Sequence, residues 1–323
     1  MSLRELFYLP EVASSHGHEI DNMIYIVHAL MLVLFIGWAI YFVIVLFKFR
    51  KKNNPKASYE GVHSHVSSYI EIAVIIAEAL LLVGLSIPFW QKQVAALPSR
   101  GDVLEIRVVA EQFAWNVHYP GHDKLFGKTG LEFFDKQSNP LGIDPADPNG
   151  KDDFVIKQLH FPTGKTILVH LSSKDVIHAF FLPEMRVKQD IIPGMSIPVW
   201  FTPTKTNRLT RQDIDGLVDD TAALWDHLVA VKYLDEDGYL TDLFKTKLTP
   251  TDMDSLDKKY EGVRKNLFSR LSKANWQIGC AQLCGIGHYY MRGLVKVHDQ
   301  KSFDTWYSEQ SSGSDEEYDD FWN

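Results

Sequence analysis

The stretch VLEIRVVAEQFAWNVHY, residues 103–119, indicates the fold of most of this chain because its apolar and polar side chains alternate. A period of two places successive side chains on opposite faces of a β-strand. The same pattern returns in KTILVHLSS (165–173), SIPVWFTP (196–203) and GLVKVHD (293–299). Residues 120–153 are rich in Gly, Pro, Asn and Asp, which predicts a long surface loop. We therefore expect a mainly β domain, folded as an antiparallel sandwich or barrel.

A helical insertion is expected over about residues 204–275, where the β pattern is interrupted. TAALWDHLVAVKYL (221–234) and SLDKKYEGVRKNLFSRLSKA (255–274) both have helical spacing. In the second segment Ser255 is placed to cap the helix. Its apolar face would consist of Leu256, Tyr260, Val263, Leu267 and Leu271.

Two apolar stretches precede the β domain. Residues 24–47 contain no formally charged side chain, and residues 69–90 are broken only by Glu71 and Glu78. Each stretch is long enough to cross a bilayer as a helix, so together they predict a transmembrane hairpin. The expected segments are an N-terminal segment 1–23, membrane spans 24–47 and 68–91 joined by a loop 48–67, a β domain 92–306 that carries the insertion, and an acidic tail 307–323.

The distribution of charge predicts the orientation of this hairpin. Five basic residues crowd the loop between the spans, whereas residues 1–23 carry one Arg and four acidic residues. Basic loops favour the cytoplasmic side, so both termini and the β domain are expected outside. The formal net charge of the chain is -8, and the last fifteen residues hold six acidic residues and no basic one. We expect a solvated, disordered tail, with the docking of a basic partner as the alternative.

The two cysteines of the chain stand in CAQLCGIGHYYM, residues 280–291, where His288 and Met291 follow Cys284 by four and seven residues. A disulfide suits an outer compartment and an even cysteine count, but it gives no reason for the histidine and the methionine. Zinc held by two Cys and two His would leave Met291 spare. Thiolate, imidazole and thioether ligands together suit copper. Two thiolates can bridge two copper ions, each with one imidazole, and this arrangement requires a second histidine from elsewhere.

This segment resembles the binuclear copper motif of subunit II of haem-copper cytochrome c oxidases, in which Cys, Cys, His and Met occur at these offsets. KDVIHAFFLPEMRVKQDIIPGM, residues 174–195, resembles the family's D-V-x-H segment followed by K-x-D-x-x-P-G. The resemblance covers roughly residues 20–200 and 275–300, and it implies a cupredoxin-like β-barrel or sandwich anchored by the N-terminal two-helix transmembrane hairpin. It further implies that two copper ions are held by His178, Cys280, the backbone carbonyl of Gln282, Cys284, His288 and Met291.

The sequence departs from the family pattern at two positions. The family carries Glu at the position of Gln282, and that side chain reaches a magnesium ion. Gln lacks the charge that hard cations prefer, which weakens the case for magnesium here. AEQFAW (110–115) resembles a Q-W-x-W segment whose first Trp admits electrons. Phe113 takes that place and Trp115 matches the second Trp, so both are candidates for the electron route, with an ordinary aromatic core as the alternative. Glu71 matches a family Glu at the start of a proton path into subunit I.

The resemblance implies a function for the whole chain. A cytochrome c would dock on the outer domain through acidic groups such as Asp175 and Asp190. Electrons would pass to the copper pair and on to haem in subunit I, where oxygen is reduced to water and protons are pumped. The expected partners are subunit I, other oxidase subunits, a cytochrome c donor and membrane lipid, with no nucleic acid, and the expected location is the bacterial inner membrane.

Other classes of protein are weaker alternatives. A membrane-anchored copper chaperone also uses a C-x-x-x-C segment with a distant His, and a structural assembly subunit would use the two cysteines as a disulfide. A quinol oxidase subunit shares the fold and the hairpin but lacks copper ligands, and nitrous oxide reductase shares the copper motif but is soluble.

Overall fold

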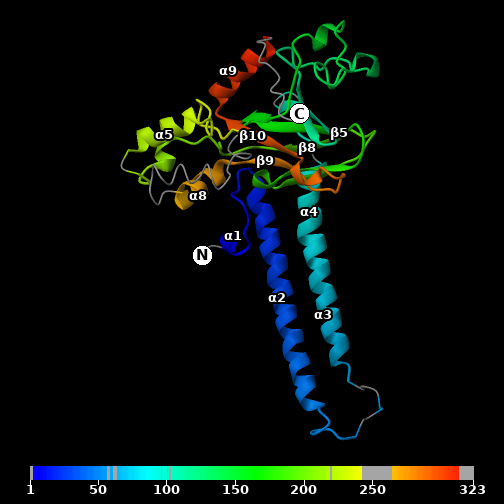
Figure 1. Cartoon of the computed structure of the whole chain (residues 1–323). Coiled ribbons are helices and arrows are strands. Elements are labelled where there is room, and N and C mark those ends of the chain that lie inside the picture. Colours follow the sequence, from blue (N-terminus) through cyan, green and yellow to red (C-terminus); the bar gives the residue numbers. More distant parts are fainter. Residues whose placement is uncertain are drawn as a thin grey trace. The chain divides into compact units, whose positions relative to one another are not determined.

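The computed structural model shows a chain of two compact units (Figure 1). One unit comprises Met1–Leu9 and His18–Leu97, and the other comprises Pro10–Gly17 and Pro98–Asn323. The residues that the structure describes are 3–56, 59–60, 64–95, 97–99, 101, 103–218, 220–241 and 264–312.

The first unit is helical in its described part. Gly17–Lys48 and Val66–Val94 are long and apolar enough to cross a membrane, and no residue in their most apolar stretches is buried. Helices that are apolar on all faces suit lipid, because their backbone hydrogen bonds are satisfied internally. The prediction of two long apolar N-terminal helices is confirmed. The elements of this part of the chain are α1 (Leu3–Leu6), α2 (Gly17–Lys48), α3 (Val66–Leu81), the π-helical turn η1 (Leu82–Ser86), α4 (Ile87–Trp90) and a second π-helical turn η2 (Gln91–Ala95).

The second unit contains two five-stranded sheets within the described residues. The first sheet has the strand order β3-β2-β1-β5-β8, and the second has the order β4-β10-β9-β6-β7. The prediction of a mainly β domain is confirmed. The strands are β1 (Val103–Glu111), β2 (Ala114–Tyr119), β3 (Phe154–Ile156), β4 (Leu159–Pro162), β5 (Thr166–Ser173), β6 (His178–Leu182), β7 (Val187–Ile191), β8 (Ile197–Phe201), β9 (Gln277–Cys280) and β10 (Arg292–His298). Short 3-10 turns between them are η4 (Leu131–Phe133), η5 (Pro148–Gly150), η6 (Pro183–Met185) and η8 (His288–Tyr290).

The stretch 103–119 folds as a hairpin of β1 and β2. The two strands pair antiparallel, with Glu111 opposite Ala114, so that only Gln112 and Phe113 lie between them. Alternate residues of β1 are buried, as the period of two predicts. The buried apolar side chains lie at even positions in β1, whereas the large apolar side chains lie at odd positions in β2. A single strand does not allow this change of parity, so the sequence does carry a signal for the turn.

Two strand pairs are parallel, so the prediction of an antiparallel architecture is wrong for them. β1 pairs in parallel with β5, and β10 pairs in parallel with β4. Parallel neighbours need a long crossover connection, and β2, β3, β4 and the loop 120–153 supply it between β1 and β5. The main core draws side chains from both sheets, including the fully or almost fully buried Ile106, Trp115, Phe161, Phe180 and Ile278.

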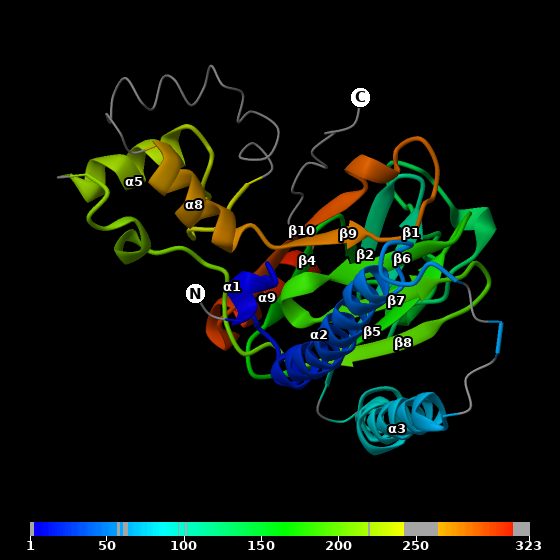
Figure 2. The same ribbon diagram turned by 90° about the horizontal axis from the view of Figure 1, so that it is seen from below.

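The helical insertion has a small core of its own. The 3-10 turn η7 (Arg211–Ile214), α5 (Thr221–Ala230) and α8 (Arg264–Ala274) belong to it. Leu224 and Leu228 of α5 and Leu271 of α8 are buried in this second cluster. Both views place α5 and α8 to one side of the strands (Figure 2). The insertion therefore packs mainly against itself and leaves the two sheets intact.

The predicted helices of the insertion differ from the observed ones in length. The helix predicted over 221–234 ends at Ala230, because Lys232 adopts a left-handed φ of 58° and Leu234 then bridges to Leu240. The helix predicted over 255–274 is described from Arg264 onward. Its predicted cap at Ser255 and the apolar residues Leu256, Tyr260 and Val263 lie outside the described residues.

Residues 10–16, which we call the strap, are bound to the β domain. The Ala13 N–H donates to the Glu184 carbonyl at 2.8 Å, and the Ala13 carbonyl accepts from Thr204 N–H at 2.7 Å. Ser15 N–H donates to the Thr202 carbonyl at 3.0 Å. The Ala13 side chain is fully buried in the main core. The strap is therefore part of the β domain, and experiments on that domain need the intact chain.

The final helix, α9 (Gln300–Ser311), includes residues that the sequence predicts to be a disordered tail. Residues 307–311 form its last turn, so the prediction is wrong for them. The cause is packing: the Tyr307 ring lies 5.4 Å from the Phe154 ring, and its hydroxyl donates to the Gly121 carbonyl at 2.9 Å. Residues 313–323 of the predicted tail lie outside the described residues.

Candidate metal centre

The cysteine motif connects two paired strands. β9 ends at Cys280 and β10 begins at Arg292, and the antiparallel pairing of Arg292 with Gly279 brings the two ends together. Residues 281–291 therefore form a loop, which we call the ligand loop. Gly285 has a φ of 129°, which side chains rarely adopt, and this lets the loop turn directly after Cys284.

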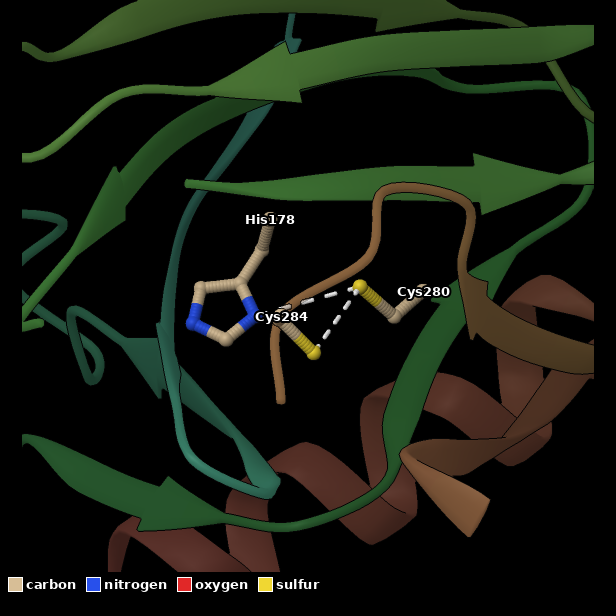
Figure 3. Close-up of side chains that lie close together, drawn as sticks. All are labelled: His178, Cys280 and Cys284. Atoms are coloured by element: carbon tan, nitrogen blue, oxygen red, sulfur yellow. Dashed lines mark hydrogen bonds between the residues drawn. The ribbon is translucent and has the colours of Figure 1, made fainter. Parts of the chain in front are cut away.

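The sheet register brings His178 to the ligand loop. His178 is the first residue of β6, and β6 pairs antiparallel with β9 so that Phe180 lies opposite Cys280. The Ala281 N–H donates to the Ala179 carbonyl at 3.1 Å, which extends this pairing into the loop. Figure 3 shows the imidazole of His178 beside the two thiols, with its Nδ1 3.8 Å from the Cys280 Sγ. Two residues 102 positions apart thus meet.

The two thiols are close together but are not bonded. The Sγ atoms of Cys280 and Cys284 lie 3.7 Å apart, whereas a disulfide bond is about 2.05 Å long. Both cysteines are free, and Cys284 is buried. The two sulfurs are therefore close enough to act as ligands of the same metal ion.

The remaining donors form two matched sets, one at each sulfur. Each set holds one imidazole nitrogen and one weaker donor. Beside the Cys280 Sγ lie His178 Nδ1 at 3.8 Å and the Gln282 carbonyl oxygen at 3.2 Å, and beside the Cys284 Sγ lie His288 Nδ1 at 3.6 Å and Met291 Sδ at 3.8 Å. The structure thus brings together all six residues that the sequence predicts as copper ligands.

The environment of the two thiols separates their acidities. Burial raises the pKa of the Cys280 thiol. Hydrogen bonding to His178 and to nearby backbone lowers it by more, so that the resulting pKa is about 6. Burial, together with the adjacent Cys280 sulfur, raises the pKa of Cys284 to about 12. One thiolate therefore forms readily, and the second forms when a cation offsets the repulsion between two negative sulfurs. Metal binding at such a pair releases protons.

An outer hydrogen bond orients the first imidazole. The His178 Nε2 lies 2.8 Å from Asp175 Oδ1, so the ring donates there and leaves Nδ1 free to face the Cys280 sulfur. Burial opposes protonation of His178, yet the hydrogen bonds to Cys280 and Asp175 raise its pKa overall. His178 is fully buried, and Cys284 and Met291 are 4% and 1% exposed. Water is therefore largely kept from this side of the site.

The chemistry of the donor set selects among metals. Thiolate, imidazole and thioether donors fit copper, whereas hard cations prefer carboxylate and carbonyl oxygen. Among the described residues, the group His178, Cys280 and Cys284 has its ligand atoms within 4.8 Å of one another and could hold a metal ion. The donor set therefore fits copper.

The two aromatic candidates for the electron route lie in different surroundings. Trp115 is 1% exposed and its ring centroid lies 6.5 Å from that of His178. Phe113 is partly buried beneath the ligand loop, and its ring lies 5.5 Å from the Tyr290 ring. Trp115 is thus a core residue beside a ligand, and Phe113 is a partly buried ring that packs against the ligand loop. The role of either ring in electron transfer stays a prediction.

Comparison with known proteins identifies the family. Residues 104–212 match the family model described as cytochrome c oxidase subunit II, periplasmic domain. The chain therefore carries a domain of the cytochrome c oxidase subunit II family. It is therefore a subunit of a cytochrome c oxidase, and the prediction of a cupredoxin-like domain behind two apolar helices is confirmed.

Individual relatives differ in how much of the subunit II chain they match. The chain is 24% identical over 304 residues to the alternative cytochrome c oxidase subunit 2 of Bradyrhizobium diazoefficiens, covering 93% of this chain and 83% of that one. It is 28% identical over 186 residues to the probable subunit 2 of Rickettsia felis, covering 57% of this chain and 53% of that one. The crystal structure of the periplasmic domain of subunit II of cytochrome oxidase from Bradyrhizobium japonicum is 21% identical, with a TM-score of 0.34, and the match covers 67% of this chain and 98% of that one. The chain thus spans most of one curated relative and about half of the other.

The other predicted site residues of this subunit II chain lie apart from the ligand atoms or at the surface. The Gln282 side chain is exposed, and only its carbonyl points to the sulfur pair. Asp190 is exposed in β7, whereas Asp175 is engaged with His178. Glu71 is exposed on α3 and has no hydrogen bond or ion pair within the described part of the chain. Magnesium binding, docking and the proton path at these residues stay predictions.

Proposed function

We propose that this subunit receives electrons from a cytochrome c at a two-copper centre and passes them to haem in subunit I, where oxygen is reduced to water and protons are pumped. The observation that carries the proposal is the unbonded sulfur pair, 3.7 Å apart, with a separate imidazole Nδ1 within 3.8 Å of each sulfur. One four-ligand zinc ion would leave Met291 Sδ and the Gln282 carbonyl unused. Two copper ions would be held by all six donors, namely His178, Cys280, the Gln282 carbonyl, Cys284, His288 and Met291.

The protein supplies the fixed geometry for this chemistry. When two copper ions are bound, they supply reversible one-electron transfer. Asp175 holds the His178 ring so that Nδ1 faces the site, and β9 and β10 hold both ends of the ligand loop. Because the ligands sit on packed strands and a closed loop, their positions change little when the charge of the site changes. A small rearrangement favours fast electron transfer.

The surface of the ligand loop suits a protein partner. Leu283, Ile286 and Tyr289 are 78%, 95% and 74% exposed, and all three alternate with donor residues along the loop. Large apolar side chains exposed together in one segment mark an interaction site. We propose that the donor cytochrome c contacts this loop and that acidic groups such as Asp190 steer a basic donor toward it.

Membrane placement follows the same proposal. The basic loop 48–67 would face the cytoplasm of a bacterial inner membrane, with both termini and the β domain outside. An exposed Glu71 on α3 would then face subunit I and begin a proton path. An amide oxygen binds Mg²⁺ more weakly than a carboxylate, so magnesium at Gln282 has less support than copper.

The test is copper loading of the intact chain purified in detergent, because the strap belongs to the outer domain. We expect two copper ions per chain and an EPR spectrum with hyperfine splitting shared over two nuclei. Met291→Leu is expected to change that spectrum, whereas Met195→Leu, at an exposed methionine, is the matched control. A mononuclear signal, or a chain that binds no copper, would overturn the proposal and favour the disulfide or chaperone alternative.

A further inference from the structure

We propose that Gln112 is a positioning residue that joins the two ligand-bearing segments of the copper centre. The proposal rests on the proposed function, because it concerns the geometry of that same site. Gln112 lies in the two-residue turn between β1 and β2, on a strand pair that supplies no ligand. Sequence reasoning passes over it, since a glutamine in a turn has ordinary reasons to be there.

The first contact of Gln112 is with the ligand loop. Its side-chain Nε2 donates a hydrogen bond to the Cys284 carbonyl at 2.6 Å. The other hydrogen bonds of residues 284–287, in the part of the chain that the structure describes, remain within residues 280–291. This amide is therefore the point at which the middle of the ligand loop is fastened to the first sheet.

The second contact is with the carboxylate that orients His178. The backbone N–H of Gln112 donates to Asp175 Oδ2 at 2.7 Å. The other carboxylate oxygen, Oδ1, receives the His178 Nε2 at 2.8 Å and the Val176 N–H at 2.7 Å. A carboxylate held at both oxygens cannot rotate away from the imidazole. One residue thus fixes partners that lie 63 and 172 positions further along the chain.

The packing around this turn is close. A Cβ atom at Gly285 would lie 2.8 Å from Gln112 Nε2, and a Cβ atom at Gly287 would lie 2.4 Å from Phe113 Cδ2. Real Cβ atoms do not approach neighbours that closely. The two glycines therefore allow the backbone of the loop to lie directly on the turn, with the amide of Gln112 at one end and the ring of Phe113 at the other.

These contacts predict what the amide does. Without it, the Cys284 carbonyl loses its donor and the loop keeps only its own local hydrogen bonds and its strand ends. Cys284, His288 and Met291 would then sample more positions relative to His178. Outer hydrogen-bond partners of metal ligands typically change metal affinity by about 10- to 100-fold when removed. A loss at the lower end of that range is expected here, because the bond is to a ligand's backbone.

The experiment compares Gln112→Met with wild type in the intact chain, in detergent. Methionine matches glutamine in length but has no donor. In the copper-free chain we expect faster hydrogen exchange of backbone amides in residues 281–290, and in the copper-loaded chain about 10-fold faster copper loss to a chelator with a shifted EPR spectrum. Gln112→Asn retains an amide, but on a side chain one methylene shorter, and is expected to show an intermediate effect. The matched control is Gln300→Met, which removes a hydrogen bond to Asp304 in α9.

Each outcome decides the matter. Exchange and copper loss equal to wild type in both Gln112 variants would overturn the proposal. A uniform rise in exchange throughout the domain, equal in the Gln300 control, would mean that the residue is only a stabilising one and would also overturn it. If wild type binds no copper pair, the proposed function fails, but the copper-free exchange measurement still tests whether Gln112 holds the loop.

Discussion

Lowering the pH is expected to destabilise the β domain through a buried pair of histidines that are not among the predicted copper ligands. His160 of β4 and His298 of β10 are each 4% exposed, and His160 Nδ1 lies 3.0 Å from His298 Nε2. The His160 ring also stacks on Trp306 of α9, with ring centroids 4.1 Å apart. One ring must donate and the other accept, so a proton added to the accepting nitrogen breaks the bond.

The magnitude follows from the acidities of the pair. Burial, aided by the positive charge of Lys296, lowers the pKa of His298 to about 4, and burial lowers the pKa of His160 well below its usual value. A histidine whose folded pKa lies below the unfolded value of about 6.5 contributes stability above pH 6.5 and loses it as the pH falls. At pH 5 the lowered pKa of His298 alone would reduce the free energy of unfolding by about 2 kcal/mol relative to its value at neutral pH. For a domain of this size that is a fall in Tm of about 4–8 °C.

The assay is thermal unfolding of the copper-free chain in detergent, followed by near-UV circular dichroism at pH 7.5 and pH 5. We expect the difference in Tm between the two pH values to be smaller in His298→Gln than in wild type, because the titrating group is gone. His122→Gln, at an exposed histidine, should keep the wild-type difference. All three chains carry the same ligand residues, so the comparison isolates the effect of position 298. A pH difference that is the same in His298→Gln as in wild type would refute the reasoning.

Two further predictions concern the metal centre. Asp175→Asn weakens the acceptor for the histidine ligand, so copper affinity, measured by competition with a chelator, should fall by about 10-fold or more, whereas Asp190→Asn should leave it unchanged. Equal copper affinities in the two variants would show that the Asp175 hydrogen bond does not hold the ligand in place. Gly287→Ala would place a Cβ atom 2.4 Å from Phe113 Cδ2 and should lower the free energy of unfolding, measured by denaturant titration, by about 1–3 kcal/mol. In Gly279→Ala the added Cβ meets nothing within 4 Å, so the free energy of unfolding should change less. Similar losses in both variants would show that the loop absorbs the extra methyl group.

Most of the donor set is predictable from sequence because five of the six donors, all except His178, lie within residues 280–291. Their spacing is a property of one loop, and a loop closed by paired strands keeps local donors together. His178 is different. No local pattern links it to Cys280, and only the register between β6 and β9 brings the two together. Its prediction therefore depends on the family resemblance of residues 174–195 and not on a physical rule that acts along the chain.

The features that sequence reasoning misses depend on tertiary contacts. The strap has no period and no charge pattern, and Ala13 is held in the core by tertiary contacts: its N–H donates to the Glu184 carbonyl, and its carbonyl accepts from the Thr204 N–H. The parallel pairing of β1 with β5 follows from a crossover that no single segment encodes. The hairpin within residues 103–119 was open to prediction, since the parity of the buried positions changes, but the alternation on either side conceals the turn.

The contacts of the turn at Gln112 and Phe113 bear on the departure from the family pattern, in which Phe113 takes the place of a Trp. The ring at position 113 lies against Gly287 so closely that no side chain fits there, and the neighbouring amide lies against Gly285 in the same way. Ring size at 113 is therefore coupled to the two glycines of the ligand loop. A larger indole at this position is therefore expected to press on the two glycines and to weaken the hydrogen bond between the Gln112 amide and the Cys284 carbonyl. The phenyl ring is thus compatible with the short hydrogen bond at Gln112, and substitutions at position 113 and in the ligand loop are expected to act together on the copper ligands.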